Sequence, residues 1–111
     1  MAQPANQKKS VDEVIKEIKM QPGFKAYILL NNDGIVVRMD QFDENVGLSY
    51  AKAVHYASHI LPLYDKTRKQ MELMAMNPAG VESIRLKSNS QEVIVSQIAQ
   101  YTLVVIHEDV H

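Results

Sequence analysis

Two histidines, His55 and His59, have the spacing that most readily suggests chemistry in this chain. They are four residues apart, so on a helix both imidazoles would project from one face and could share a metal ion. No HExxH pattern surrounds them, and no third ligand stands nearby in the sequence. Lysines recur around the pair at helical spacing, which is typical of a solvated helix face. We therefore predict that both histidines are exposed and that the chain has no metal site.

No other group of side chains has the environment that catalysis requires. The chain contains no cysteine, which excludes disulfides, thiolate metal sites and a cysteine nucleophile. The acidic pairs Asp12-Glu13 and Glu108-Asp109 stand near the chain ends, where water keeps carboxylates ionised and unsuited to general acid–base work. The turn Asn31–Gly34 lacks the glycine run and the Lys-Ser/Thr pair of a phosphate loop. We expect no enzyme activity and no cofactor.

Composition places the chain among small globular domains. Its 111 residues suffice for one domain with a real core. The formal net charge of −1 argues against nucleic acid or an anionic membrane as a partner, and Arg85 and Lys87 do not outweigh it. No apolar run approaches the roughly 20 residues of a membrane span, so we expect a soluble cytoplasmic protein without membrane insertion. Residues 1–10 are predicted to be a flexible tail, residues 11–107 the domain and residues 108–111 a second tail.

The first predicted elements are a short helix and a β-hairpin. Ser10 and Glu13 form a capping-box pattern, apolar residues follow at helical spacing, and Pro22-Gly23 ends the run. The next stretch, FKAYILLNNDGIVVRMD, places Asp33-Gly34 between two apolar runs. Asp-Gly in this position is a strong hairpin signal, because Gly adopts a positive φ without steric cost.

Two predicted strands, Ala26–Leu30 and Leu103–Ile106, are apolar without a break, which is typical of strands covered on both faces. They should therefore lie side by side in the centre of a sheet. Further strands at Val81–Lys87 and Glu92–Ile98, with the second hairpin arm, complete the pattern α-β-β-α-β-β-β. Hairpin connections then give the spatial order 2-1-5-4-3. The predicted fold class is α+β: a three-layer arrangement of one five-stranded, mostly antiparallel sheet with a helix on each face.

A long helical pattern runs from about Leu48 to Met76. Its polar positions form one solvated stripe, made of Lys52, His55, His59, Pro62, Lys66 and Lys69. Most of the remaining perimeter is apolar, a wider arc than one sheet face can cover, so a second burying surface is implied. Pro62 should kink the helix on the side where freed carbonyls can meet water. Met71, Met74 and Met76 fit either the core or an adaptable partner-binding patch.

The strand Val81–Lys87 is left at one edge of the sheet, with backbone N–H and C=O groups that no neighbouring strand pairs. Its side chains alternate, with Ile84 and Leu86 on one face and Ser83, Arg85 and Lys87 on the other. The open edge and the wide apolar arc of the long helix together predict a dimer.

These segments together resemble the roadblock family of dynein light chains. The likeness covers most of the chain and includes YILLNNDGIVV at the hairpin, HYASHI and KTR in the long helix, IRLKSNSQEVIV in the third and fourth strands, and YTLVVI in the last. The order and spacing of these segments make the likeness specific. The long stretch Asp40–Ala53 and the presence of Pro62 depart from the family pattern. The roadblock/profilin-like fold that the resemblance implies agrees with the predicted strand order.

The resemblance implies a non-catalytic homodimer. In that family the long helices pack antiparallel across a two-fold axis, and the third strands pair edge to edge. Carried over to this chain, the implied interface residues are Val54, Ala57, Leu61, Tyr64, Met71, Val81, Ser83, Ile84, Arg85 and Lys87.

The resemblance also implies a role in microtubule-based transport. Members of that family bind the dynein intermediate chain and help to hold the motor's cargo-binding complex together. This role would place the protein on the cytoskeleton, in the cytoplasm or in a cilium or flagellum. Roadblock-like proteins also scaffold or regulate small GTPases, as in lysosomal scaffolds and bacterial polarity proteins. The sequence leaves both roles open, and it leaves open whether the second copy is identical or a paralogue.

Overall fold

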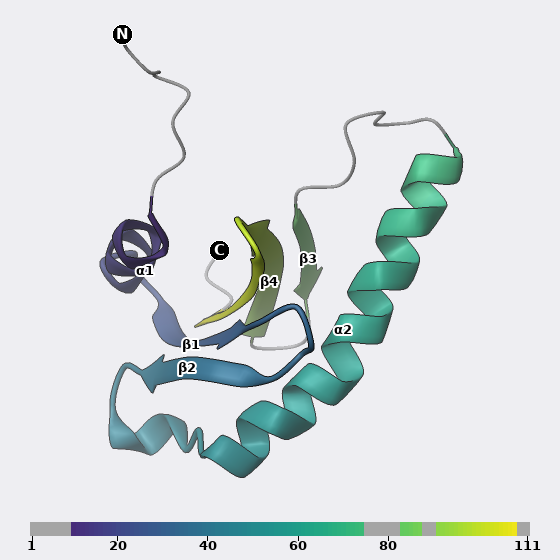
Figure 1. The fold of residues 1–111 in the computed structure, drawn as a ribbon. Helices are drawn as coiled ribbons and strands as arrows, with labels where there is room; N and C mark the ends of the chain where they lie inside the picture. Colours follow the sequence, from purple (N-terminus) through teal and green to yellow (C-terminus); the bar gives the residue numbers. More distant parts are fainter. Residues whose placement is uncertain (1–9, 75–82, 88–90, 109–111) are drawn as a thin grey trace, which may run out of the picture.

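The computed structural model describes residues 10–74, 83–87 and 91–108 (Figure 1). The helices are α1 (Val11–Lys19), the short 3-10 helix η1 (Glu44–Val46) and α2 (Tyr50–Leu73). The strands are β1 (Phe24–Leu30), β2 (Val36–Gln41), β3 (Ser83–Lys87), β4 (Gln91–Ile98) and β5 (Tyr101–Glu108). The predicted order α-β-β-α-β-β-β is confirmed, and β5 extends one residue past the predicted domain boundary.

The five strands form one sheet in the order β2-β1-β5-β4-β3, as predicted, and every neighbouring pair is antiparallel. The two α-helices lie on opposite faces of this sheet (Figure 1). Alternate residues of β1 explain the arrangement. Ala26, Ile28 and Leu30 pack into a cluster with α2, whereas Tyr27 and Leu29 pack into a second cluster with α1. The central strand is apolar throughout because it serves two cores at once.

The capping box predicted at the start of α1 is present. The Ser10 hydroxyl accepts a hydrogen bond from the Glu13 N–H at 3.1 Å, and the Glu13 carboxylate accepts one from the Ser10 N–H at 3.0 Å. Two ion pairs then tie α1 to β2: Lys19 to Asp40 at 2.8 Å and Arg38 to Asp12 at 2.7 Å. The helix is therefore held in place by its buried stripe on one side and by β2 on its flank.

Replacing Asp40 with Asn should remove an acid-sensitive part of the stability. Lys19 donates a hydrogen bond to the Asp40 carboxylate, and the Gln41 N–H donates a second, so the pKa of Asp40 lies below its ordinary value of 3.8. A carboxyl whose pKa falls on folding stabilises the native state above its unfolded pKa, and this contribution disappears as the pH drops through the folded pKa. Both partners are roughly half exposed, so the loss at pH 7 should be only about 0.5 kcal/mol. Urea unfolding at neutral pH and near pH 2 checks this, and an equal loss at both would contradict it.

The turn between β1 and β2 is built as the Asp-Gly signal predicts. The Asn31 side-chain oxygen accepts hydrogen bonds from the Asp33 N–H at 2.9 Å and the Ile35 N–H at 3.0 Å, and Gly34 has a φ of +80°. A Cβ at Gly34 would lie 3.0 Å from the Leu61 Cδ1 atom, so the turn also presses closely against α2. Glycine therefore serves both the backbone conformation and the packing.

The link to α2 and the bounds of that helix differ from the sequence prediction. β2 continues to Gln41, and η1 lies within the stretch Asp40–Ala53 that departs from the family pattern. α2 begins at Tyr50 rather than Leu48, because the Ser49 hydroxyl accepts a hydrogen bond from the Lys52 N–H and so caps the helix. The predicted end at Met76 lies outside the described residues. α2 runs without a break through Pro62, and its axis bends along its length in Figure 1.

Candidate protein-interaction surface

The sheet has two edges, and the β2 edge is poorly suited to pairing. The register between β1 and β2 shifts between Leu29 and Leu30, which marks a bulge. The Phe42 N–H donates to the Lys25 carbonyl, toward β1. Since backbone groups of successive residues point to opposite sides of a strand, the Gln41 N–H points outward, where the Asp40 carboxylate accepts its hydrogen bond at 2.8 Å. A bulge and an occupied donor both oppose the addition of another strand.

The β3 edge lacks these features among the described residues. Its register with β4 is continuous from Ser83 to Lys87. Exposure alternates along the strand as predicted: Ile84 and Leu86 are half-buried, and Ser83, Arg85 and Lys87 are exposed. Ile84 packs against the cluster under α2, so the apolar face of β3 is the α2 face. β3 is therefore the edge that a second strand can extend.

A two-residue turn fixes which backbone groups of β3 point outward. Ile98 and Tyr101 pair across Ala99-Gln100, and Ala99 has a φ of +53°. In a hairpin with a two-residue turn the closing pair is hydrogen-bonded, so the backbone N–H and C=O groups of Ile98 point toward β5. These groups point to opposite sides in successive residues, so those of Val95 and Val93 point toward β3. Their partners there are Ile84 and Leu86. The N–H groups between them, those of Ser83 and Arg85, consequently point away from the sheet.

The flanks of α2 face different neighbours. Leu61 lies against Gly34 of the β1–β2 turn, and seven residues further along the same side Arg68 donates a hydrogen bond to Gln97 of β4. We name this side of α2 the β2 flank after the first of these contacts. Tyr56 shares a small cavity with Gln91 of β4, Ile106 of β5 and residues 46–48 of the link after β2, and we name its side of α2 the β4 flank. Leu63 is seven residues from Tyr56 and therefore within about 20° of it around the axis. A second helix packed along the β4 flank would therefore contact Leu63.

The structure gives the proposed interface residues of α2 different degrees of exposure and places them on different sides of the helix. Ala57 and Tyr64 are buried inside the single chain, and Leu61 is half-buried against the hairpin, so these three offer little surface to a second copy. Val54 is 43% exposed but shares the β2 flank with Leu61. Leu63, which the predicted interface did not include, is 42% exposed on the β4 flank. Hydrophobicity alone could not separate the two flanks, because the rotation of α2 is set by its contacts.

Met71 and Val81 complete the proposed interface set, and Met74 and Met76 belong with Met71 to the methionine cluster predicted for either the core or a partner-binding patch. Met71 is half-buried, and Met74 is 57% exposed. Met76 and Val81 lie outside the described residues. Met74 is 11 residues from Leu63 and therefore lies within about 20° of it around α2, so it extends the β4 flank.

The histidine pair lies on the solvent side of α2. All six residues of the predicted polar stripe are exposed, which confirms the stripe. The His55 and His59 rings contact each other edge to face, with centroids 4.6 Å apart. Among the residues that the structure describes, no group of three His, Cys, Asp or Glu side chains could hold a metal ion.

Replacing His55 and His59 together with Gln should leave the free energy of unfolding within about 0.5 kcal/mol of wild type, as for ordinary surface changes. Thermal and urea unfolding of both proteins measure this. Stoichiometric zinc or nickel binding in calorimetry, lost in the double variant, would contradict the interpretation of the pair as solvated.

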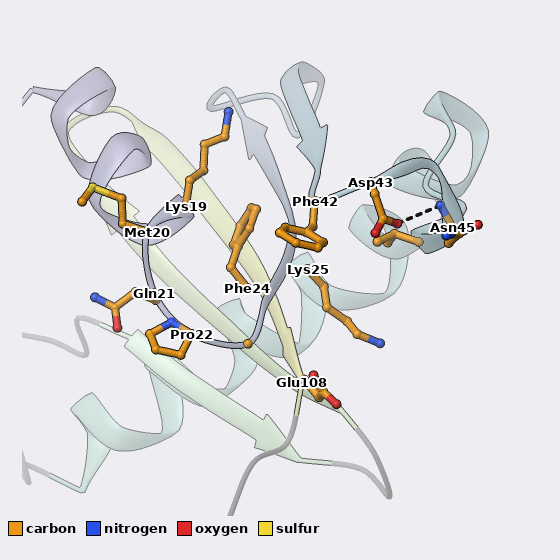
Figure 2. A pocket seen from close by; sticks show the side chains of 12 residues that line it. Lys19, Met20, Gln21, Pro22, Phe24, Lys25, Phe42, Asp43, Asn45 and Glu108 are labelled. Carbon is orange, nitrogen blue, oxygen red and sulfur yellow. Dashed lines mark hydrogen bonds between the residues drawn. The ribbon is translucent and has the colours of Figure 1, made fainter.

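A hollow lies between the end of α1 and the link after β2 (Figure 2). Its volume is about 580 Å³. Met20 is 76% exposed and Phe42 71% exposed, and in Figure 2 they stand on either side of Phe24. Sequence reasoning missed this patch, because single apolar residues beside Pro22-Gly23 and in a polar link carry no periodic signal. Exposed apolar side chains around a hollow are typical of protein contact surfaces.

Among the described residues, the surface features that stand out are the β3 edge, the exposed Leu63 and the hollow beside Met20 and Phe42. None of the helices in the described part of the chain is long and apolar enough to cross a membrane.

Comparison with known proteins agrees with this picture. The profile of the Roadblock/LC7 domain family matches residues 10–107, and that family indicates no enzyme activity. A Roadblock/LC7 domain from Streptomyces avermitilis is 20% identical, with 90% of this chain and 79% of that one covered and a TM-score of 0.67. The gliding protein mglB from Thermus thermophilus is 13% identical, with 96% and 81% covered and a TM-score of 0.67. Myxococcus xanthus MglB is 13% identical, with 87% and 71% covered and a TM-score of 0.64.

At these identities the structural likeness shows the fold alone. No curated protein sequence matches the chain. The family profile, by contrast, spans all but the two ends of the sequence, and so this protein belongs to the Roadblock/LC7 domain family.

Proposed function

We propose that this protein is a non-catalytic dimeric scaffold that binds and regulates a small GTPase. Roadblock-like proteins with this role were one of the two functional classes that the sequence resemblance allowed. Two of the three similar structures above are MglB proteins, which are small-GTPase regulators, and this likeness favours the GTPase role. The competing role, a light chain of dynein bound to its intermediate chain, is supported only by the sequence resemblance.

The dimer is supported by two surfaces that a second copy could cover together: the β3 edge of the sheet and one flank of α2. β3 has a regular register and outward-pointing donors, and its apolar Ile84 lies on the same face of the sheet as α2. The β4 flank of α2 presents Leu63 to solvent. A second copy related by a two-fold axis would pair β3 with β3 and lay its own α2 over Ile84. Both apolar surfaces would then be covered by one isologous contact.

Affinity capture from native extract separates the two roles. The full chain, tagged at its N-terminus, is incubated with extract in the presence of either GDP or a non-hydrolysable GTP analogue, and the bound proteins are identified by mass spectrometry. The proposal expects one small GTPase, recovered in an amount that depends on the nucleotide, and direct binding when that GTPase is purified. Recovery of dynein intermediate and heavy chains would establish the competing role. Recovery of neither class would refute both.

A further inference from the structure

The backbone around the hollow beside Met20 and Phe42 is held by the sheet. The Phe42 N–H donates a hydrogen bond to the Lys25 carbonyl at 2.6 Å, which ties the link after β2 to β1. The Glu108 N–H donates to the Gly23 carbonyl at 2.8 Å, which ties the end of β5 to the segment that follows α1. A partner that enters the hollow would therefore not have to order these segments first, and binding would cost less conformational entropy.

The walls of the hollow are apolar and open to solvent. Phe24 is 6% exposed, its ring contacts His107 edge to face, and in Figure 2 it lies between the two exposed walls, Met20 and Phe42. Small-molecule pockets bury roughly 70–90% of a ligand's surface. Walls that are themselves about three-quarters exposed do not enclose a small molecule to that extent. A protein segment can enter between them and also cover them from outside, so the shape favours a protein.

Two charged side chains of opposite sign are available at the hollow. Lys25 is half-buried and Glu108 is exposed, and both line it. Neither side chain has an ion-pair partner among the residues that the structure describes. Two other charged lining residues are already engaged. Lys19 pairs with Asp40 at 2.8 Å, and the Asp43 carboxylate accepts a backbone hydrogen bond at 2.9 Å. A complementary partner would therefore bring one carboxylate and one cation.

We propose that the hollow binds an exposed loop of a partner protein, in which a large apolar side chain stands between an acidic and a basic residue. The apolar side chain would enter between Met20 and Phe42. The acidic residue would pair with Lys25 and the basic residue with Glu108, through charge-assisted hydrogen bonds. Because the two charges differ in sign, they would determine the direction in which the loop lies and disfavour loops with the reverse order.

The occupant is a different protein rather than a second copy of this chain. Two copies joined hollow to hollow would bring two concave surfaces together, and neither would be filled. The dimer proposed above uses β3, and β1, β5 and β4 separate that edge from β2 and the link that follows it. Each copy in such a dimer would keep its hollow accessible. The inference goes beyond the GTPase role and does not depend on it.

The test begins with a library of random nine-residue peptides displayed on phage. The library is selected on the immobilised full chain and depleted on the variant Phe42→Ser, which should fold normally because Phe42 is exposed. We expect enrichment of peptides with Phe, Leu, Met or Trp between an acidic and a basic residue. The most enriched peptide is then synthesised, and calorimetry measures its dissociation constant for the full chain.

The variant Met20→Ser, which played no part in the selection, should weaken binding of that peptide by at least about tenfold. Ile35→Ser is the matched control, because Ile35 is 53% exposed beside the β1–β2 turn. It should bind the peptide as wild type does. Equal weakening by Met20→Ser and Ile35→Ser would overturn the proposal.

Charge reversal tests the chemistry of the partner. Lys25→Glu should weaken binding by about tenfold, and replacing the acidic residue of the peptide with Lys should restore it. Damage to the fold would not be repaired by a change in the peptide. Three results would each overturn the proposal: no enrichment over Phe42→Ser, enriched peptides without the two charges, or no recovery with the reversed peptide. A lower mass of free Phe42→Ser than of wild type in sedimentation equilibrium would also overturn it, since a second copy would then occupy the hollow.

Discussion

Proline at Arg85 should yield folded monomers, whereas proline at Leu86 should destabilise the whole fold by roughly 3 kcal/mol or more. Proline removes the backbone N–H and is tolerated in sheets mainly where that group has no partner strand. The Leu86 N–H points to β4 and would be lost from the interior of the sheet. The Arg85 N–H points outward, so its loss affects only the strand of a second copy. Because backbone N–H groups alternate in direction along a strand, the sequence alone predicts two classes of proline variant. The Ala99-Gln100 turn then shows which residues belong to each class.

Sedimentation equilibrium and urea unfolding of the two proline variants measure both effects. Arg85→Ala and Leu86→Ala are the matched controls, because each removes the side chain and keeps the N–H. Arg85→Ala should remain a dimer, which separates loss of the donor from loss of the charge. If Arg85→Pro remained a folded dimer, β3 would not be the pairing edge, and the dimer would rest on the helices alone.

Leu63→Glu should raise the dimer dissociation constant by about a hundredfold or more. Each dimer would carry two such substitutions, and each would place an unpaired carboxylate in an apolar contact, which costs a few kcal/mol. The folded monomer should be nearly unaffected, because Leu63 is exposed in the single chain. Analytical ultracentrifugation across the micromolar range measures the change.

Val54→Glu, which places the same charge on the other side of the same helix, is the matched control. Val54 and Leu63 are almost equally exposed, and they are nine residues apart, so they lie about 180° from each other around α2. The same charge on the β2 flank should leave the dimer intact. If Val54→Glu dissociated the dimer and Leu63→Glu did not, the second copy would lie on the β2 flank, as the sequence-based interface that included Val54 and Leu61 implied.

Much of the fold could be predicted, because its sequence signals involve residues close together in the chain or depend only on whether a residue is apolar or polar. The unbroken apolar runs in β1 and β5 marked them as central strands, and short connections then determined the order of the other three. The capping box at Ser10 and the turn at Gly34 follow from side-chain chemistry within a few residues.

The surface was less predictable because it depends on relative placement. The sequence shows that α2 is apolar over a wide arc, but not that Tyr64 turns inward and Leu63 outward. That choice is set by contacts with distant segments, such as Leu61 against Gly34 and Tyr56 near Gln91. The hollow between Met20 and Phe42 likewise joins two loops that are remote in sequence.

The bulge in β2 and the occupied Gln41 N–H limit how large an assembly can become. When two copies join through β3, the ends of the combined sheet are both β2 strands, and each presents a shifted register and a donor already bound by Asp40. Such a sheet has no growing end. Raising the protein concentration should therefore produce more pairs and not longer polymers, whereas a chain with two regular edges could add copies indefinitely into a filament.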